Sequence, residues 1–279
     1  MDLRNVSTGL QLGQDGIWRA AGAAALSYPS EGHLRCAAVE GASFWFRHRN
    51  RCIVAATQRY PPPAGGPIFD IGGGNGHVSL GLAAAGFAVV LLEPGIDGAS
   101  NAKLRGLDTV VCATTDSAGF LPAVMPAIGV FDVIEHLDDD LAFVQSLQRL
   151  LVMGGRLYAT VPAHQGLWSQ EDVAAGHYRR YSLGSISGLL ERAGFRIDFA
   201  TYFFRPLPLP IFLMRALPHR LGRVQQGVLE PDSMARDHAV QQEWVSRLLE
   251  RMLAAEISNV SAGHAMRFGA SCLLVASKI

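Results

Sequence analysis

The chain lacks several patterns that each indicate a particular class of protein. Its cysteines at positions 36, 52, 112 and 272 contain no C-x-x-C pair, so they give no zinc or redox signature and no disulfide framework. The first residues contain no charged segment followed by an apolar run, which a secretory signal requires. The longest apolar stretch, residues 203–217, is broken by three prolines and two arginines. We therefore expect a cytoplasmic protein without stable membrane insertion.

The chain also lacks an excess of charge of either sign. Its 279 residues include 24 basic and 24 acidic side chains, so the formal net charge is zero. This balance argues against a protein that binds nucleic acid non-specifically. Hydrophobic residues make up 49% of the chain and charged residues 17%, which predicts a globular protein with a sizeable core.

A glycine-rich stretch at residues 68–76 reads I-F-D-I-G-G-G-N-G. The apolar run that ends at Asp70 and Ile71 is typical of a buried strand, and the glycines after it indicate a tight turn. Residues 77–85 favour a helix that Gly86 ends. Glycines let a ligand approach the backbone closely, and a helix start offers unpaired N–H groups.

The order of acid and glycines in this loop is D-x-G-x-G-x-G, with Asp70 before Gly72, Gly74 and Gly76. A dinucleotide loop instead reads G-x-G-x-x-G and binds a pyrophosphate, which a carboxylate would repel. The pattern resembles the first motif of the class I S-adenosylmethionine-dependent methyltransferases. In that family the loop holds the methionine part of the cofactor. The alternative is a glycine-rich turn of an unrelated α/β protein.

Two later strand ends supply further candidates for cofactor binding. Residues 87–92 form an apolar run that ends at Glu93, 17 residues after Gly76, where a carboxylate can accept both ribose hydroxyls. Residues 109–114 predict a third strand. The resemblance places a polar contact to adenine just after this strand, at Thr115 and Asp116.

The run F-D-V-I-E-H-L at residues 131–137 follows the fourth predicted strand, residues 127–134. Apolar residues at helical spacing and a fifth strand, residues 156–162, come next. This order is similar to that of the same methyltransferases and implies cofactor contacts at Phe131 and Asp132. Strands that alternate with helices predict a Rossmann-like, doubly wound sheet of seven strands, mostly parallel with an antiparallel last strand.

We predict four segments in the chain. Residues 1–60 form an N-terminal helical cap, in which a helix near 43–59 brings Trp45 over the cofactor to exclude water and directs Arg47 and Arg51 toward an anion. The alternative is an ordinary amphipathic helix that docks on the core. Residues 61–205 form the cofactor-binding core, and residues 266–279 contribute its last strand. Between these parts, residues 206–265 form a helical insertion that acts as a lid, a dimer contact, a contact with a membrane surface or extra core packing.

Residues 162–182 follow the fifth strand and are unusually rich in aromatic and charged side chains. The segments P-A-H-Q-G-L-W-S and H-Y-R-R-Y-S are similar to those of a bacterial subgroup often called type 11 or type 12. The resemblance implies an acceptor pocket with a small-molecule substrate. The predicted substrate-binding residues are His164, Trp168, Tyr178, Arg179, Arg180 and Tyr181. The two arginines favour a polar or anionic acceptor, because guanidinium groups bind carboxylates and phosphates.

Methyl transfer from a sulfonium needs aligned partners, and a base that removes the acceptor's proton. The candidate bases are His136, His177 and Asp172, and histidine suits the role because its pKa lies near neutrality. The cofactor is predicted to be S-adenosyl-L-methionine, with no metal. A weaker alternative is a divalent ion on Asp132, Glu135 and His136, whose D-x-x-E-H spacing is similar to that of some quinone O-methyltransferases.

Three other functions compete with a small-molecule methyltransferase. A repurposed member of the fold would bind the cofactor without catalysis, but Asp70, the glycines and Glu93 are all present. A nicotinamide-dependent oxidoreductase is disfavoured by the order of acid and glycines. A nucleic-acid methyltransferase is disfavoured by zero net charge and the absence of N-P-P-Y or D-P-P-Y. The sequence leaves open whether the chain forms a homodimer.

Overall fold

A computed structural model describes residues 2–20, 43–222 and 243–279 of the chain, with side chains from residue 251 onward in the last range. The described residues build one nine-stranded sheet in the order β1-β2-β5-β4-β3-β6-β7-β9-β8. The strands are β1 (Leu10–Leu12), β2 (Ile17–Ala20), β3 (Ile68–Ile71), β4 (Val89–Leu92), β5 (Thr109–Cys112), β6 (Met125–Phe131), β7 (Leu151–Pro162), β8 (Phe195–Phe203) and β9 (Ser271–Lys278).

Helices connect most of these strands. The longer ones are α2 (Phe44–Arg59), α3 (His77–Ala84), α4 (Ile96–Leu104), α5 (Asp140–Leu150), α6 (Gln170–Ala175), α7 (Leu183–Arg192) and α11 (Glu243–Ala262). Short turns of helix are η1 (Leu3–Asn5), η2 (Pro63–Gly65), η3 (Ile134–His136), η4 (Gln165–Leu167), α8 (Pro208–Ile211), η5 (Phe212–Ala216) and α9 (Leu217–Arg220).

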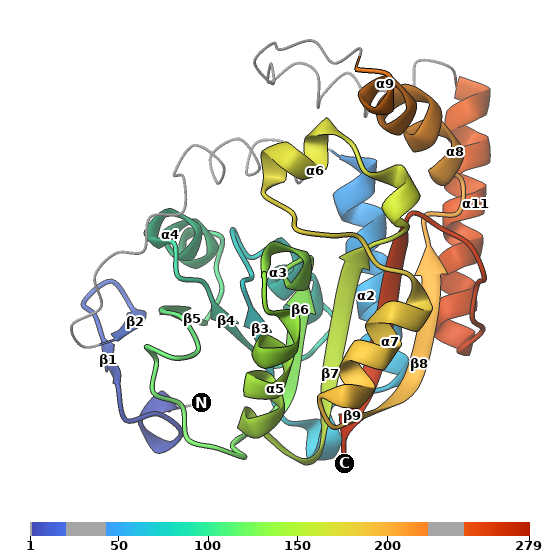
Figure 1. The fold of residues 1–279 in the computed structure, drawn as a ribbon. Helices are drawn as coiled ribbons and strands as arrows, with labels where there is room; N and C mark the ends of the chain where they lie inside the picture. Colours follow the sequence, from blue (N-terminus) through green and yellow to red (C-terminus); the bar gives the residue numbers. More distant parts are fainter. Residues whose placement is uncertain (1, 21–42, 223–242) are drawn as a thin grey trace.

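The five neighbouring strands β5, β4, β3, β6 and β7 are parallel to one another. Strand β9 lies between β7 and β8 and is antiparallel to both. Helices α5 and α7 cover the face of the sheet nearest the viewer in Figure 1, while α2 and α11 lie behind it. Carboxyl ends of parallel strands therefore meet at one edge, which is where open α/β sheets bind ligands. The predicted Rossmann-like fold with an antiparallel last strand is confirmed.

The start of the chain differs from the prediction. The helix expected near residues 43–59 is present as α2, but residues 10–20 form the β1–β2 hairpin instead of a helical cap. Strand β2 pairs in parallel with β5, so the sheet gains two strands beyond the seven expected. Residues 21–42 of the predicted cap lie outside the described residues.

The core has one apolar layer on each face of the sheet. One layer packs the sheet against α5 and α7 through side chains such as Val144, Leu147 and Ile186. The other packs it against α2, α3 and α11 through Ile53, Leu82 and other buried residues. Burial of both faces explains why the central strands read as continuous apolar runs.

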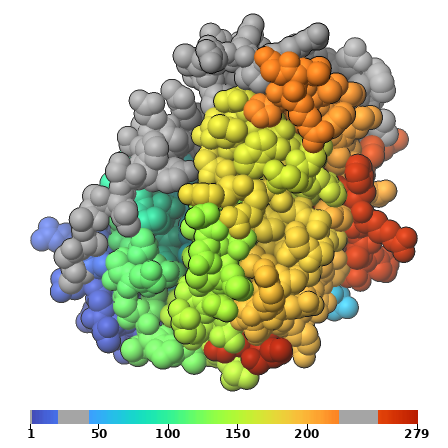
Figure 2. All heavy atoms as spheres, viewed as in Figure 1, coloured from blue at the N-terminus to red at the C-terminus, as the bar shows by residue number. Residues whose placement is uncertain are grey.

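The predicted insertion at residues 206–265 is helical where it is described, as α8, η5, α9 and α11. Arg220 donates a hydrogen bond to the carbonyl of Gly166, which ties this region to the segment after β7. The yellow and orange segments adjoin at the surface in Figure 2. In the described parts of the chain, none of the helices is both long and apolar enough to cross a membrane.

Gly269, just before β9, lies so close to the end of β8 that a substitution there can test this packing. A Cβ at Gly269 would lie 2.1 Å from the carbonyl oxygen of Phe203, a backbone atom that cannot rotate away. We expect Gly269→Ala to lower the free energy of unfolding by about 1–3 kcal/mol, because overpacking forces the backbone to shift. The measurement is urea denaturation followed by circular dichroism.

The matched control is Gly188→Ala in α7, where a Cβ meets no atom of the described residues within 4 Å. Alanine in a helix is favoured over glycine by up to about 1 kcal/mol, so this variant should be as stable as the wild type or more so. Equal stability of the two variants would show that residue 269 does not approach β8 closely.

Candidate active site

The glycine loop between β3 and α3 contains backbone that only glycine adopts readily. Gly72, Gly74 and Gly76 have φ angles of 72°, 53° and 79°. A left-handed conformation costs other residues about 1–2 kcal/mol. At Gly74, a Cβ would meet no atom of the described residues within 4 Å, whereas at Gly76 it would lie 2.8 Å from Leu107. The backbone at Gly74 is therefore accessible to a ligand.

Glu93 holds this loop in place from the end of β4. Its carboxylate accepts hydrogen bonds from the backbone N–H of Gly74 at 2.9 Å and from that of Gly95 at 2.7 Å. The side chain is buried. The structure thus brings the two predicted elements together, the glycine loop and the acid expected to bind ribose hydroxyls.

Asp70 lies beneath the loop at the end of β3 and is buried. Its Oδ2 accepts a 2.6 Å hydrogen bond from the Ser79 hydroxyl on α3. Burial raises the pKa of Asp70 to about 6, against the opposing effects of the Ser79 hydrogen bond and the Arg49 charge. A buried carboxylate with few donors is suited to a cationic ligand such as an ammonium group.

Asp132 follows β6 and has a φ of 57°, an uncommon conformation for a non-glycine residue. Its Oδ1 accepts a hydrogen bond from Thr160 at 2.9 Å, and its Oδ2 lies 3.0 Å from the Nε of Arg49. Arg49 also donates to the carbonyl of Phe131 at 3.2 Å. Helix α2 is thereby anchored over the end of β6.

Trp45, the aromatic residue predicted to cap the cofactor, lies at the start of α2 and faces the residue that follows β8. The Trp45 ring stacks on Phe204, with centroids 3.9 Å apart. Thr115 and Asp116 lie in the turn after β5, where Asp116 is exposed. Their contact to adenine stays a prediction.

Three predicted catalytic residues come together at the end of β6. The rings of His136 and His177 meet edge to face with centroids 4.7 Å apart. The Nδ1 of His177 lies 2.9 Å from Oδ1 of Asp172. Asp172 is buried, and its Oδ1 also accepts from Arg180 at 2.7 Å. Asp172, His177 and His136 thus form a row in which the carboxylate contacts one imidazole and that imidazole contacts the other.

Burial opposes ionisation of Asp172, but the hydrogen bonds from His177 and Arg180 outweigh it and lower the pKa to about 2. Burial lowers the pKa of His136, and the neighbouring His177 lowers it further. His136 is therefore neutral at pH 7, the state in which an imidazole accepts a proton.

Glu135 is fully buried beside these histidines, and neither of its carboxylate oxygens has a hydrogen-bond partner among the described residues. Burial, followed by the charge of Asp132, raises its pKa well above the usual value. Ligand atoms of Glu135, His136 and His177 lie within 4.8 Å of one another, as a divalent cation would need. The weaker metal hypothesis had named Asp132, which is outside this group, in place of His177.

The predicted acceptor residues lie on the segment after β7, but most of their polar groups are occupied. Arg179 pairs with Asp140 at 2.9 Å, and Arg180 pairs with Asp172 at 2.7 Å. The buried Tyr181 donates to Asp140. Both guanidinium groups thus have carboxylate partners within the chain, so their binding of an acceptor anion stays a prediction.

The three aromatic residues of this segment are placed differently. Tyr178 is exposed, His164 stacks on Tyr202 with centroids 4.8 Å apart, and Trp168 is partly buried. His164 has a φ of 60°, which turns the chain at the end of β7. Their contact with substrate stays a prediction.

Sequence reasoning missed Ser79 and Arg49. It singled out Arg47 and Arg51 on α2 as the residues that face an anion, but both line a groove of about 510 Å³ between α2, α3 and α11. The helical spacing could not show which face of α2 meets β6. Ser79 lies in the first turn of α3, nine residues after Asp70, and this position at the helix start could have suggested a contact with the acid at the end of β3.

Comparison with known proteins agrees with this geometry. A family profile described as "Methyltransferase domain" matches residues 45–198, more than half of the chain. A curated ubiquinone biosynthesis O-methyltransferase of Xylella fastidiosa strain 9a5c is 31% identical over 105 residues. That alignment covers 36% of this chain and 43% of the relative, so the chain spans less than half the length of this curated protein.

Two solved structures have a similar fold. Phosphoethanolamine N-methyltransferase 2 of Haemonchus contortus, in complex with S-adenosyl-L-methionine, is 19% identical with a TM-score of 0.54 and covers 90% of this chain and 57% of its own. A possible histamine N-methyltransferase of Thermotoga maritima is 15% identical with a TM-score of 0.54 and covers 90% of this chain and 100% of its own.

The chain belongs to the methyltransferase-domain family. The class I S-adenosylmethionine-dependent fold inferred from the two motifs is confirmed, and so is the methyl donor that the family uses. The residues present fit that donor: the loop backbone at Gly74, the acid at Glu93 and the buried carboxylate of Asp70 lie at one edge of the sheet.

Two glycines of the loop should separate ligand binding from folding. We expect Gly74→Ala to cost about 1–2 kcal/mol of stability from backbone strain alone and to weaken S-adenosylmethionine binding clearly. Gly76→Ala carries the same strain and adds an overlap with Leu107, so it should lose more stability. Calorimetric titration and thermal unfolding of both variants check this. Unchanged cofactor affinity in Gly74→Ala would contradict it.

The raised pKa of Asp70 gives cofactor binding a pH dependence. A cationic ligand binds the ionised carboxylate, so affinity should rise as pH increases through about 6. Between pH 7.5 and pH 5 the Kd should increase by about tenfold, because only about a tenth of the groups remain ionised at pH 5. Asp70→Asn is the control and should bind weakly with a flat profile. A flat wild-type profile would show that Asp70 does not face the cationic part of the cofactor.

Proposed function

We propose that the chain transfers a methyl group from S-adenosyl-L-methionine to an oxygen or nitrogen atom of a small polar acceptor, with His136 as the general base. The observation that carries this proposal is the chain of Asp172, His177 and His136 at the end of β6. It lies beside Asp132, which the resemblance assigns to the cofactor. The sulfonium supplies the electrophile, so the protein's task is to align the acceptor and remove its proton.

The placement of each residue supports a distinct role. Asp172 accepts from His177 and Arg180, so the ion pair with Arg180 fixes the carboxylate against which His177 is oriented. His177 then contacts the His136 ring from the side. His136 is partly buried, which favours its neutral form and brings the acceptor hydroxyl or amine out of bulk water.

The polar character of the acceptor is supported by what surrounds this chain of residues. The buried carboxyl of Glu135 has no hydrogen-bond partner among the described residues, and an acceptor hydroxyl or amine would satisfy it. The curated relatives named ubiquinone biosynthesis O-methyltransferases support an oxygen acceptor. An anionic group on the acceptor would be met by Arg179 or Arg180, once either exchanges its present partner.

The test is the kinetics of a His136→Ala variant. Hydroxyl and amine compounds are screened with the wild type for release of S-adenosylhomocysteine, and the best acceptor is used. We expect kcat to fall by about 10²–10⁴-fold, the usual contribution of a general base, while cofactor Kd stays within about twofold. The wild-type rate should fall at acid pH as His136 becomes protonated.

The control is His264→Ala, which removes an exposed histidine between α11 and β9. It should keep the wild-type kcat. His177→Gln should lower kcat less than His136→Ala does, because it removes only the orienting group. If His136→Ala turned over at the wild-type rate, His136 would have no part in the chemistry. If the wild type bound cofactor but used no hydroxyl or amine, the acceptor class would be wrong.

A further inference from the structure

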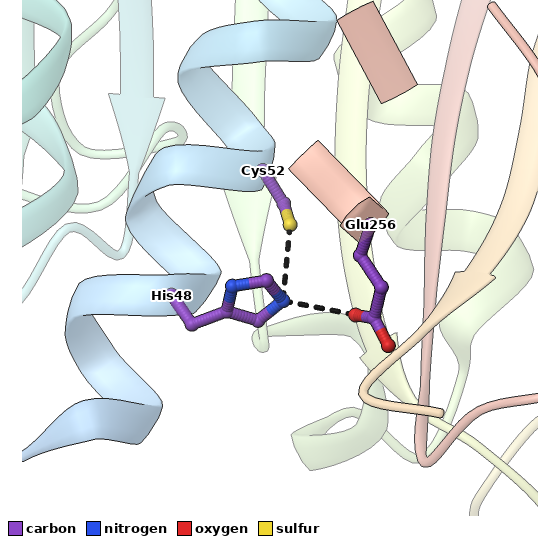
Figure 3. A group of neighbouring side chains, drawn as sticks. All are labelled: His48, Cys52 and Glu256. Atoms are coloured by element: carbon purple, nitrogen blue, oxygen red, sulfur yellow. Dashed lines mark hydrogen bonds and ion pairs between the residues drawn. The ribbon is translucent and has the colours of Figure 1, made fainter. Parts of the chain in front are cut away.

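A second group of polar side chains lies outside the candidate active site, buried between α2 and α11. His48 and Cys52 extend from α2 toward Glu256 of α11 (Figure 3). The Nε2 of His48 lies 2.9 Å from Oε2 of Glu256 and 3.4 Å from the Sγ of Cys52. Between 0% and 4% of each residue is exposed. None of the predicted functions uses these three residues.

The local structure explains how they converge. His48 and Cys52 are four residues apart on α2, so they lie one turn apart on the same face of the helix. Glu256 is contributed by α11, more than 200 residues later in the chain. The cysteine spacing gave no zinc signature because that signature is a pair of cysteines, and here a single cysteine meets two other ligand types.

The three ligand atoms are close enough to share one cation. All of them lie within 4.8 Å of one another. A single N–H at Nε2 can be directed in good geometry at the carboxylate or at the sulfur, but not at both. A cation between the three atoms would be bound by nitrogen, sulfur and oxygen at once.

The spacing is close to that of a tetrahedral zinc site. Zinc bonds of about 2.0–2.3 Å to N, O and S place neighbouring ligands about 3.3–3.6 Å apart in a tetrahedron. The Sγ to Nε2 distance of 3.4 Å lies in this range, and the Nε2 to Oε2 distance of 2.9 Å needs to open by only a few tenths of an ångström.

Neighbouring groups already hold Glu256 as they hold ligands in known metal sites. The backbone N–H of Phe204 donates to its Oε2 at 2.8 Å, and that of Arg205 donates to its Oε1 at 2.7 Å. The His48 ring packs edge to face on Phe204 with centroids 5.0 Å apart. Such outer contacts fix ligand orientation and are a regular part of zinc sites.

We propose that His48, Cys52 and Glu256 bind one zinc ion that joins α2, α11 and the end of β8. The ligand types favour zinc over magnesium or calcium, which prefer oxygen alone. A thiolate and a carboxylate carry two negative charges, which Zn²⁺ neutralises in surroundings where unbalanced charge is costly. On binding, the thiol proton of Cys52 is released to solvent, and the imidazole of His48 keeps its one proton on Nδ1 so that Nε2 is free to bind the ion. The three side chains supply three of the four positions of a tetrahedral site. Because they are shielded from solvent, the ion would link α2 to α11 and would not meet a substrate.

Metal content and spectrum of the full chain test this proposal. The protein is incubated with Zn²⁺ or Co²⁺ alone and desalted, and bound metal is measured by mass spectrometry. We expect one ion per chain and, with Co²⁺, the charge-transfer absorption of a thiolate ligand together with the strong visible bands of tetrahedral cobalt. Removal of the ion should lower the Tm and speed amide exchange at Phe204 and Arg205.

Three variants separate this site from others. Cys52→Ser should lose the charge-transfer band and the ion, while Cys112→Ser, which removes a partly exposed thiol, should keep both. His177→Gln disrupts the cluster near Glu135 and should also keep both. The wild-type cobalt spectrum decides the matter even if Cys52→Ser fails to fold.

The proposal is overturned if the wild type retains no ion, or if cobalt binds without a thiolate band. It is equally overturned if Cys52→Ser and His48→Gln fold and retain the metal, or if only His177→Gln loses it. None of these outcomes depends on methyl transfer, so the proposed activity can fail or hold independently.

Discussion

The parallel register of three adjacent strands determines where the chemistry of this protein can lie. Strand β3 pairs with β4 on one side and with β6 on the other, so the three strands end at the same edge of the sheet. Asp70, Glu93 and Asp132, which are well separated in the chain, are brought together there. The backbone of the glycine loop is then fixed by Glu93, and α2 is fixed by the ion pair of Arg49 with Asp132. Each acid thus contributes to packing at the edge of the sheet where we predict the ligand site.

Much of this could be predicted from the sequence, because the signals are local. A buried strand, a loop of glycines and the start of a helix occur within about twenty residues, and the turn needs positive φ angles that glycine adopts at low cost. Glu93 and the run from Phe131 to Leu137 could be predicted for the same reason, because each comes where an apolar strand ends. The order of strands and the helices between them were therefore accessible, as was the helix that begins after Ser43, whose hydroxyl accepts from the N–H of Trp45.

The remainder depends on contacts between distant residues, which no local pattern encodes. The β1–β2 hairpin is short and finds its place by pairing with β5, so the sequence alone places residues 10–20 in the helical cap predicted from the helix that follows them. The two arginines after β7 seemed free to bind an anion, yet tertiary packing provides them with Asp140 and Asp172. The edge-to-face contact between His136 and His177 likewise depends on how the loop after α6 returns to β6.

The position of β9 has a consequence for how the chain folds. This strand is the last to be synthesised among the described elements, yet it is inserted between β7 and β8 and pairs with both. Until residues 271–278 leave the ribosome, the facing edges of β7 and β8 have no partner from this strand, and exposed strand edges attract other chains. Contacts of such high sequence separation also slow folding. A nascent chain of this protein is therefore more vulnerable to aggregation before β9 is released than after it, and a chaperone would benefit it most at that stage.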